Sequence, residues 1–336
     1  MTIKDIAKAC GVGVSTVSRV LNARPDVSPE VRERVLQMVE STGYIPNNSA
    51  RDLGRSQTDT IGVVVRGMGN LFFSQVLNTI TQEVDRTGYT LVPRFIDSDA
   101  DEVKAGAILE REKKLRGLIF LGGRFDYSAS ELSLVGVPYV CCSFTNRFGS
   151  LSEEEYSSVC IDDFRTAFRA VELLIAHGHR RIAALVPSRS DHSISELRFE
   201  GYKAALAEHG IPYDESLVVE TGGCFTMPES YEGVCRLLKR TAEFTAAFVL
   251  SDTTALAAIK ALEDHGRRVP EDVSVIAIDG LEISAYTMPT LSTMVQPAEE
   301  MGRESVRLLM EILKGGPHRH VCLETSLREG GSLRSL

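Results

Sequence analysis

Short runs of consecutive apolar residues alternate with amphipathic stretches from residue 60 almost to the end of the chain. Strand-like runs include TIGVVVRG (60–67), RGLIFLGG (116–123) and DVSVIAID (272–279), and helix-like stretches such as LFFSQVLNTITQEVDRTG (71–88) separate them. Near-continuous apolar strands between helices are typical of parallel sheets that are covered on both faces. Two such groups in tandem predict two similar α/β lobes, with a ligand cleft beyond the carboxyl ends of the strands.

The first 45 residues lack this alternation and have the pattern of three short helices. Ile3, Ile6, Ala7 and Cys10 form one apolar face, and Gly11 follows where a left-handed residue ends a helix. In the next stretch, VSTVSRVLN, Val17, Val20 and Leu21 form the buried side and Ser, Thr and Arg lie on the other, and Ser28-Pro29 begins a third helix. This arrangement predicts an all-α helix-turn-helix unit, whose second helix enters the major groove of duplex DNA.

Composition limits the remaining possibilities. The net charge of the 336-residue chain is −9, yet residues 1–58 carry eight Lys/Arg and six Asp/Glu, so a mildly basic head is joined to an acidic body. This suits DNA held at one end only. The seven cysteines form no CxxC pair and the histidines lack ligand spacing, which favours reduced thiols, no metal and no cofactor. The absence of a signal-like or membrane-length apolar run predicts a cytoplasmic protein.

The chain resembles the lactose-repressor (LacI/GalR) family of bacterial transcription regulators. The segments that carry the resemblance are TIKDIAKACGVGVSTVSRVLN, VRERVLQMVESTGYIPN, ARDL, RFEGYKAAL, FVLSDTTALAAIKAL, VPEDVSVIAIDG and TLSTMVQP. It implies a homodimeric repressor that binds a palindromic operator under the control of a sugar-like effector. The expected parts are a helix-turn-helix head (1–46), a hinge helix (47–58) and an effector-binding and dimerisation body (59–336), which resembles periplasmic binding proteins. Within the body we expect one lobe at about 59–161 and 291–320 and a second at about 162–290 and 321–336.

The resemblance also assigns the residues that contact DNA. Val14, Ser15 and Arg19 match the base-reading set, and the planar fork of Arg19 suits guanine O6 and N7. Thr16, Ser18 and Asn22 match phosphate contacts that set the register. In the hinge, Asn47, Ala50 and Leu53 match the minor-groove element, with Leu53 as an apolar wedge between base pairs.

The resemblance assigns eight effector-binding residues at strand ends and in adjoining loops. Arg and Asp in such places suit polyhydroxylated ligands, because each can bond two neighbouring hydroxyls. One of the two adjacent phenylalanines is expected in the core. The eight are Phe72, Phe73, Ser143, Arg198, Ser251, Asp252, Asp279 and Gln296.

Two other classes of protein share parts of this pattern. A solute-binding transport component has the same two-lobed body, but a secretory signal is missing and a DNA-binding unit is fused. An enzyme is disfavoured because the glycine-rich turns lack the G-x-G-x-x-G and Walker patterns, and G-x-S-x-G and H-E-x-x-H motifs are absent. A tetramer is disfavoured because residues 321–336 lack the heptads of a coiled coil.

Overall fold

The computed structural model describes residues 2–21, 24, 26–42, 58–67, 69–124, 126–147, 149–222 and 225–336. The chain divides into two compact units, Met1–Gln57 and Thr58–Leu336, here called the head and the body. No helix in the described ranges is both long and apolar enough to cross a membrane.

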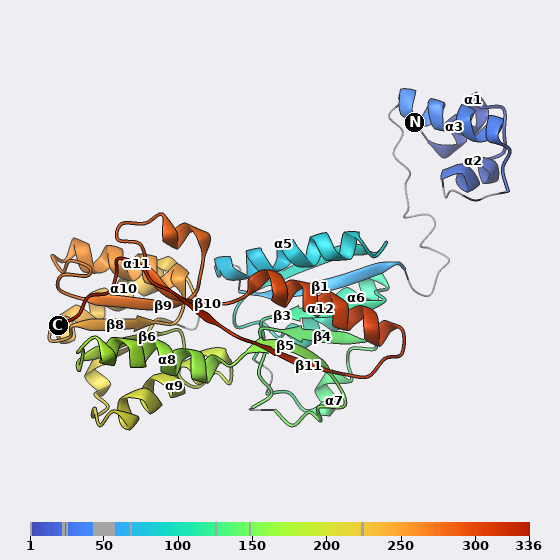
Figure 1. The fold of residues 1–336 in the computed structure, drawn as a ribbon. Helices are drawn as coiled ribbons and strands as arrows, with labels where there is room; N and C mark the ends of the chain where they lie inside the picture. The colour runs from blue at the N-terminus through green and yellow to red at the C-terminus, as the bar shows by residue number, and fades with distance from the viewer. Residues whose placement is uncertain are drawn as a thin grey trace. The chain divides into compact units, whose positions relative to one another are not determined.

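The head contains α1 (Ile3–Ala9), α2 (Val14–Leu21) and α3 (Pro29–Thr42) around one small core (Figure 1). The Asp5 carboxylate accepts hydrogen bonds from the Thr2 N–H at 2.8 Å and the Thr2 hydroxyl at 2.9 Å, which fixes the start of α1. Gly11 has a φ of +62°, the left-handed conformation expected after the first helix. The carbonyl of Gly13 accepts the first hydrogen bonds of α2, so this glycine begins the second helix.

The first lobe of the body is a six-stranded parallel sheet with the order β11-β5-β4-β3-β1-β2. Its helices α5 and α12 pack on one face, and α6 and α7 pack on the other. Alternate strand residues therefore enter two separate cores, which explains the near-continuous apolar runs. The elements are β1 (Thr60–Arg66), α5 (Leu71–Asp85), β2 (Thr90–Ile96), α6 (Glu102–Lys113), β3 (Gly117–Leu121), α7 (Ala129–Leu132), β4 (Tyr139–Cys142), β5 (Ser157–Ile161), α12 (Ala298–Leu313) and β11 (His320–Leu323).

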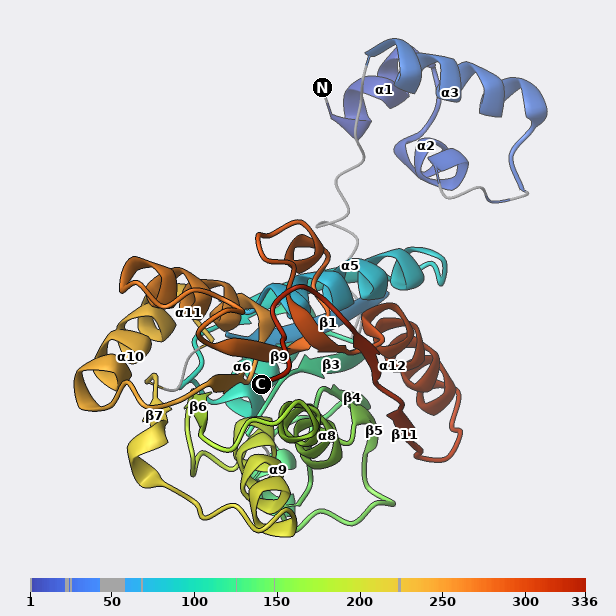
Figure 2. The same ribbon diagram turned by 60° about the vertical axis from the view of Figure 1, so that its left-hand side comes forward.

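The second lobe repeats this plan with the order β12-β10-β9-β8-β6-β7, in which only β12 is antiparallel to its neighbour. Helices α8 and α9 cover one face, and α10 and α11 cover the other, as the turned view shows (Figure 2). The elements are α8 (Asp163–Ala176), β6 (Ile182–Val186), α9 (Ile194–Glu208), η1 (Glu215–Leu217), β7 (Val218–Glu220), α10 (Met227–Arg240), β8 (Ala246–Val249), α11 (Asp252–Asp264), β9 (Ser274–Asp279), η2 (Glu282–Ala285), β10 (Ser292–Val295) and β12 (Ser326–Arg328).

The fold class predicted from the sequence is confirmed, but the expected lobe boundaries need correction. The chain crosses between the lobes at 161–163, 295–298 and 323–326 (Figure 1). Residues 292–295 form β10 of the second sheet, so the expected return to the first lobe at 291 is too early. Residues 320–323 form β11 of the first sheet, so the expected exit at 320 is also too early. The reason is that each crossing follows the end of a strand, which the apolar pattern alone did not locate.

Candidate functional site

The second helix of the head exposes the residues predicted to read base edges. Val14, Ser15 and Arg19 are exposed, whereas Val17 and Val20 are buried in the head core. An Arg19 Nη1 atom lies 3.5 Å from Asp26 Oδ2, and both side chains are more than half exposed. Such a pair contributes little stability, so Arg19 is available to another partner.

The other predicted DNA contacts divide into two groups. Thr16 and Ser18 are half-buried on α2. Four lie outside the residues that the structure describes, and these are Asn22, Asn47, Ala50 and Leu53.

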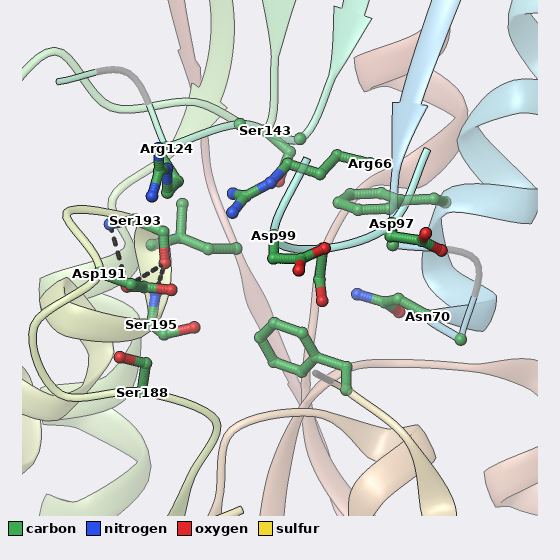
Figure 3. Close-up of a pocket in the computed structure, with 18 of the residues that line it drawn as sticks. Arg66, Asn70, Asp97, Asp99, Arg124, Ser143, Ser188, Asp191, Ser193 and Ser195 are labelled. Carbon is green, nitrogen blue, oxygen red and sulfur yellow. Dashed lines mark hydrogen bonds between the residues drawn. The ribbon is translucent and has the colours of Figure 1, made fainter. Parts of the chain in front are cut away.

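The body contains a cavity of about 580 Å³ between its lobes (Figure 3). The first lobe contributes residues that follow β1, β2, β3 and β4, and the second contributes the loops after β6 and β7 together with the first turn of α9. The cavity therefore lies at the carboxyl ends of the strands, as predicted for this kind of sheet. Its polar lining residues include Arg66, Asn70, Asp97, Ser98, Asp99, Arg124, Ser143, Ser188, Asp191, Ser193, Ser195 and Thr226.

Two of the eight predicted effector residues, Phe73 and Ser143, line this cavity. Phe72 is 1% exposed and belongs to the core of the first lobe, which is the division expected for adjacent phenylalanines on a helix. The Phe73 ring lies against Gly122, where an added Cβ would be 2.7 Å from a ring carbon. Gly122 also has a φ of +75°, so glycine is required at this turn for two reasons.

The structure brings the remaining predicted residues together in the interior of the second lobe and not on the cavity wall. Arg198, 1% exposed, donates from Nε to Asp163 Oδ1 at 2.8 Å and from Nη1 to the Leu250 carbonyl at 2.5 Å. Its Nη1 lies 3.8 Å from Asp279 Oδ1, which also accepts from Gln296 Nε2 at 2.8 Å. We call Asp163, Arg198, Asp279 and Gln296 the buried cluster. Contact of Arg198, Asp279 and Gln296 with an effector stays a prediction.

Ser251 and Asp252 lie beside the buried cluster and have structural partners. The Ser251 hydroxyl accepts from the Thr254 N–H and caps α11. The Asp252 carboxylate accepts from the Leu281 N–H at 2.7 Å, the Ser284 hydroxyl at 2.8 Å and the Thr293 hydroxyl at 2.5 Å. These bonds join α11 to the segment at 281–284 and to β10, and Asp252 has no exposed surface.

Burial raises the pKa values of Asp163, Asp252 and Asp279 above the ordinary range of a carboxyl group. For Asp163 and Asp279 the Arg198 charge partly offsets this effect. One guanidinium serves two carboxylates that are almost completely shielded from water, so their charges are only partly compensated. Asp279 Oδ2 and Gln296 Oε1 are buried, and neither has a hydrogen-bond partner among the residues that the structure describes.

Sequence reasoning missed several charged residues of the cavity wall. Arg66 ends β1, Asp97 follows β2 directly, and Arg124 comes three residues after β3. Each lies at or just after the carboxyl end of an apolar strand, so the rule that placed the cleft at strand ends was sufficient to find them. Asp191 lies in the loop after β6, and its Oδ1 accepts from the Ser193 N–H and hydroxyl at 3.2 and 2.6 Å.

A helix-turn-helix unit joined to a two-lobed body with a polar cavity defines a DNA-binding protein with a small-molecule site. Residues 2–47 match the family described as bacterial regulatory proteins, lacI family, and residues 171–333 match the periplasmic binding protein-like domain. The chain is 40% identical to the HTH-type transcriptional regulator MalR of Clostridium butyricum, over 99% of both chains. It therefore belongs to the lacI family of bacterial transcriptional regulators.

Two solved structures extend this comparison over nearly the whole chain. The complex of the transcriptional regulator CelR with cellobiose is 31% identical, with a TM-score of 0.71 and 99% of both chains covered. The Lac repressor dimer bound to operator and the anti-inducer ONPF is 25% identical, with a TM-score of 0.77 and coverage of 99% of this chain and 98% of the other.

Proposed function

We propose that this regulator is a repressor that binds a palindromic operator as a homodimer and is controlled by a sugar-like effector in the cavity between its lobes. The observation that carries the proposal is a polar cavity bounded by both lobes in a chain that also presents an exposed, Arg-bearing second helix. A volume of about 580 Å³ falls within the range of small-molecule sites. The printed names of relatives support this choice, since CelR was solved with cellobiose and Lac repressor with operator.

The cavity chemistry favours a polyhydroxylated ligand. Carboxylates, guanidinium groups and serine hydroxyls line its two sides, so donors and acceptors face a ligand from both lobes (Figure 3). Phe73 from the first lobe and Phe225 from the second add apolar surface on which a sugar ring can pack. A ligand held by both lobes stabilises one angle between them, and the operator affinity changes with that angle.

An exposed apolar patch on the second lobe suits contact with a second copy. Ile283, Tyr286 and Met288 are 50%, 80% and 97% exposed and lie in and just after η2. Exposed apolar side chains that gather in one place are typical of interaction surfaces. A homodimer is expected because one head reads only a short half-site and a palindromic operator needs two. We place part of the homodimer contact at this apolar patch.

We further propose that the protein acts in the cytoplasm, where operator DNA is found, and that it is not an enzyme. In the described residues, no group of three or more His, Cys, Asp or Glu side chains is placed to hold a metal ion. The buried carboxylates at Asp163, Asp252 and Asp279 have structural partners and do not line the cavity.

Fluorescence anisotropy with labelled genomic fragments tests the proposal. We expect saturable binding to one or a few fragments that survives competitor DNA, and a change of affinity when a ligand of the cavity is added. Binding of equal strength to all fragments at every salt concentration would refute the operator assignment. Turnover of a cavity ligand would instead identify an enzyme.

A further inference from the structure

Arg66 and Arg124 line one side of the cavity, and both contact the buried Glu102 carboxylate, Arg66 through its guanidinium and Arg124 through its backbone. Arg66, with a side chain 11% exposed, places its Nε 3.9 Å from Glu102 Oε2, and Glu102 has no exposed surface. The other Glu102 oxygen accepts from the backbone N–H of Arg124 at 2.7 Å. Both arginines therefore border the same carboxylate, and in Figure 3 both reach into the cavity on the side of Ser143.

The hydrogen-bonding capacity of this wall is not used up. Arg66 Nε, Arg124 Nε and Glu102 Oε2 are buried and have no hydrogen-bond partner within the described part of the chain. Buried polar atoms of native proteins are normally paired. Of these three, the two guanidinium N–H groups belong to residues that line the cavity, and they indicate a missing hydrogen-bond acceptor there.

The wall also has an excess of positive charge. The Arg66 guanidinium lies beside the Glu102 carboxylate, and the Arg124 guanidinium belongs to a second residue that lines the same cavity. Ser143, which is 4% exposed, adds a hydroxyl without a charge. Among the described side chains, Glu102 alone comes within salt-bridge distance of Arg66, and Arg124 has no such partner. Charges shielded from water interact more strongly than solvated ones, so this excess acts on a ligand at short range.

The acidic residues of the cavity do not cancel this charge. Asp97 and Asp99 are exposed, and Figure 3 shows Asp97 beside Asn70 and away from Arg124. Asp191 uses its carboxylate to bind Ser193 within its own loop. Because solvent screens the exposed carboxylates, the cavity has a cationic buried wall and an anionic rim.

We propose that the effector carries an anionic group, a carboxylate or a phosphate ester, which binds between Arg66 and Arg124 and accepts a hydrogen bond from the Ser143 hydroxyl. This assignment rests on the effector function proposed above. Guanidinium forks match both groups in bidentate geometry, and charge-assisted hydrogen bonds of this kind are stronger than neutral ones. The sugar ring then lies between Phe73 and Phe225, with hydroxyls toward the aspartates of the rim.

The test is a thermal-shift screen of the full-length protein against hexoses and disaccharides, each offered as the neutral sugar, the uronic acid and the phosphate ester. A ligand that binds the folded state raises its melting temperature. We expect stabilisation by an acidic or phosphorylated member and not by its neutral parent. The uronic acid and ester arms distinguish the two anions, and inorganic phosphate alone measures what the anion contributes without the sugar.

Variants then assign the contact. Arg66→Gln and Arg124→Gln should each weaken binding of the anionic ligand at least tenfold by calorimetry. The control Arg86→Gln makes the same change just after the end of α5, where the side chain is 69% exposed and paired with Glu83, and should leave the affinity unchanged. Ser143→Asp adds a carboxylate at a residue with a φ of +55°, which aspartate tolerates, and should abolish binding of the anion.

The outcomes separate this proposal from the one it rests on. If neutral sugars bind as well as their anionic forms, or if both arginine variants bind the anion normally, the anionic assignment is overturned while the effector function stands. If no member of the screen binds, the sugar-like effector itself is refuted, together with this assignment.

Discussion

Replacing Arg198 with methionine should destabilise the second lobe without touching the cavity wall. The guanidinium group of Arg198 lies between the carboxylates of Asp163 and Asp279. Methionine keeps much of the aliphatic part of the arginine side chain, so the void left by the substitution is small. The loss of the positive charge therefore dominates the change in stability. The two carboxylates would then remain buried without their cation.

The expected loss follows from that arrangement. Removing one partner of a buried ion pair typically costs about 3–5 kcal/mol of unfolding free energy. The loss must also depend on pH, because burial already holds the pKa values of both carboxyls above their unfolded values. A raised carboxyl pKa destabilises the fold at pH values above the unfolded pKa, and the penalty grows until the folded pKa is passed. The variant should therefore lose more stability at pH 8 than at pH 5, where protonation removes the stranded charges.

Urea unfolding followed by circular dichroism at the two pH values measures this difference. The variant Arg86→Met is the control, since it removes an exposed arginine of the first lobe and should change stability by less than about 0.5 kcal/mol. Adding Asp279→Asn to Arg198→Met should recover part of the loss, because one of the two stranded charges disappears. Equal stability of Arg198→Met and the parent protein at pH 8 would refute the reasoning.

Three further predictions address the head, the dimer and the packing of the second lobe. Arg19→Ala should abolish the preference for operator over random DNA, whereas the control Lys4→Ala, which changes an exposed basic residue of α1, should preserve it. Fluorescence anisotropy measures both variants, and an unchanged preference in Arg19→Ala would contradict the role of Arg19. Tyr286→Asp should shift the protein toward monomer in sedimentation velocity, and an intact dimer would remove the patch from the interface. Gly201→Ala should lower the free energy of unfolding by about 1–3 kcal/mol, because the added Cβ would lie 2.3 Å from the Phe164 carbonyl oxygen. Urea unfolding measures this loss, and an unchanged midpoint would show that α8 and α9 can separate freely.

The sequence predicted those features that depend on local patterns. Apolar runs and helix periodicity located the two sheets, and Gly11 and Ser28-Pro29 located the ends of helices in the head. The pattern did not reveal that the chain stays in the second lobe through β10 before it forms α12. Sheet membership depends on pairing between segments far apart in the chain, for example Ser292 beside Ile276, and no local signal encodes it.

The sequence predicted the location of the cavity but not which side chains line it. Strand ends indicated the cleft, yet whether a side chain at a strand end faces the cleft or the interior depends on the packing around it. Arg198 lies one turn beyond the cavity residues of α9 and is held inward by Asp163, whereas Arg66 ends its strand at the cavity itself. The residue type is the same in both cases, so only the partners distinguish a wall residue from a buried one.

The buried cluster explains how an event in the cavity can reach the connections between the lobes. Asp163 is the first residue of α8 after the crossing at 161–163, and Gln296 lies within the crossing at 295–298. Both contact the pair formed by Arg198 and Asp279, and Arg198 shares α9 with Ser195 of the cavity wall. Close-packed interiors change between discrete arrangements and do not deform continuously, so a ligand that moves the first turn of α9 must also shift the contacts at two crossings.

A ligand that bound both arrangements equally would leave the operator affinity unchanged however tightly it bound. Regulation therefore requires effector contacts that differ between the two arrangements, and contacts that bridge the lobes are the ones that meet this condition.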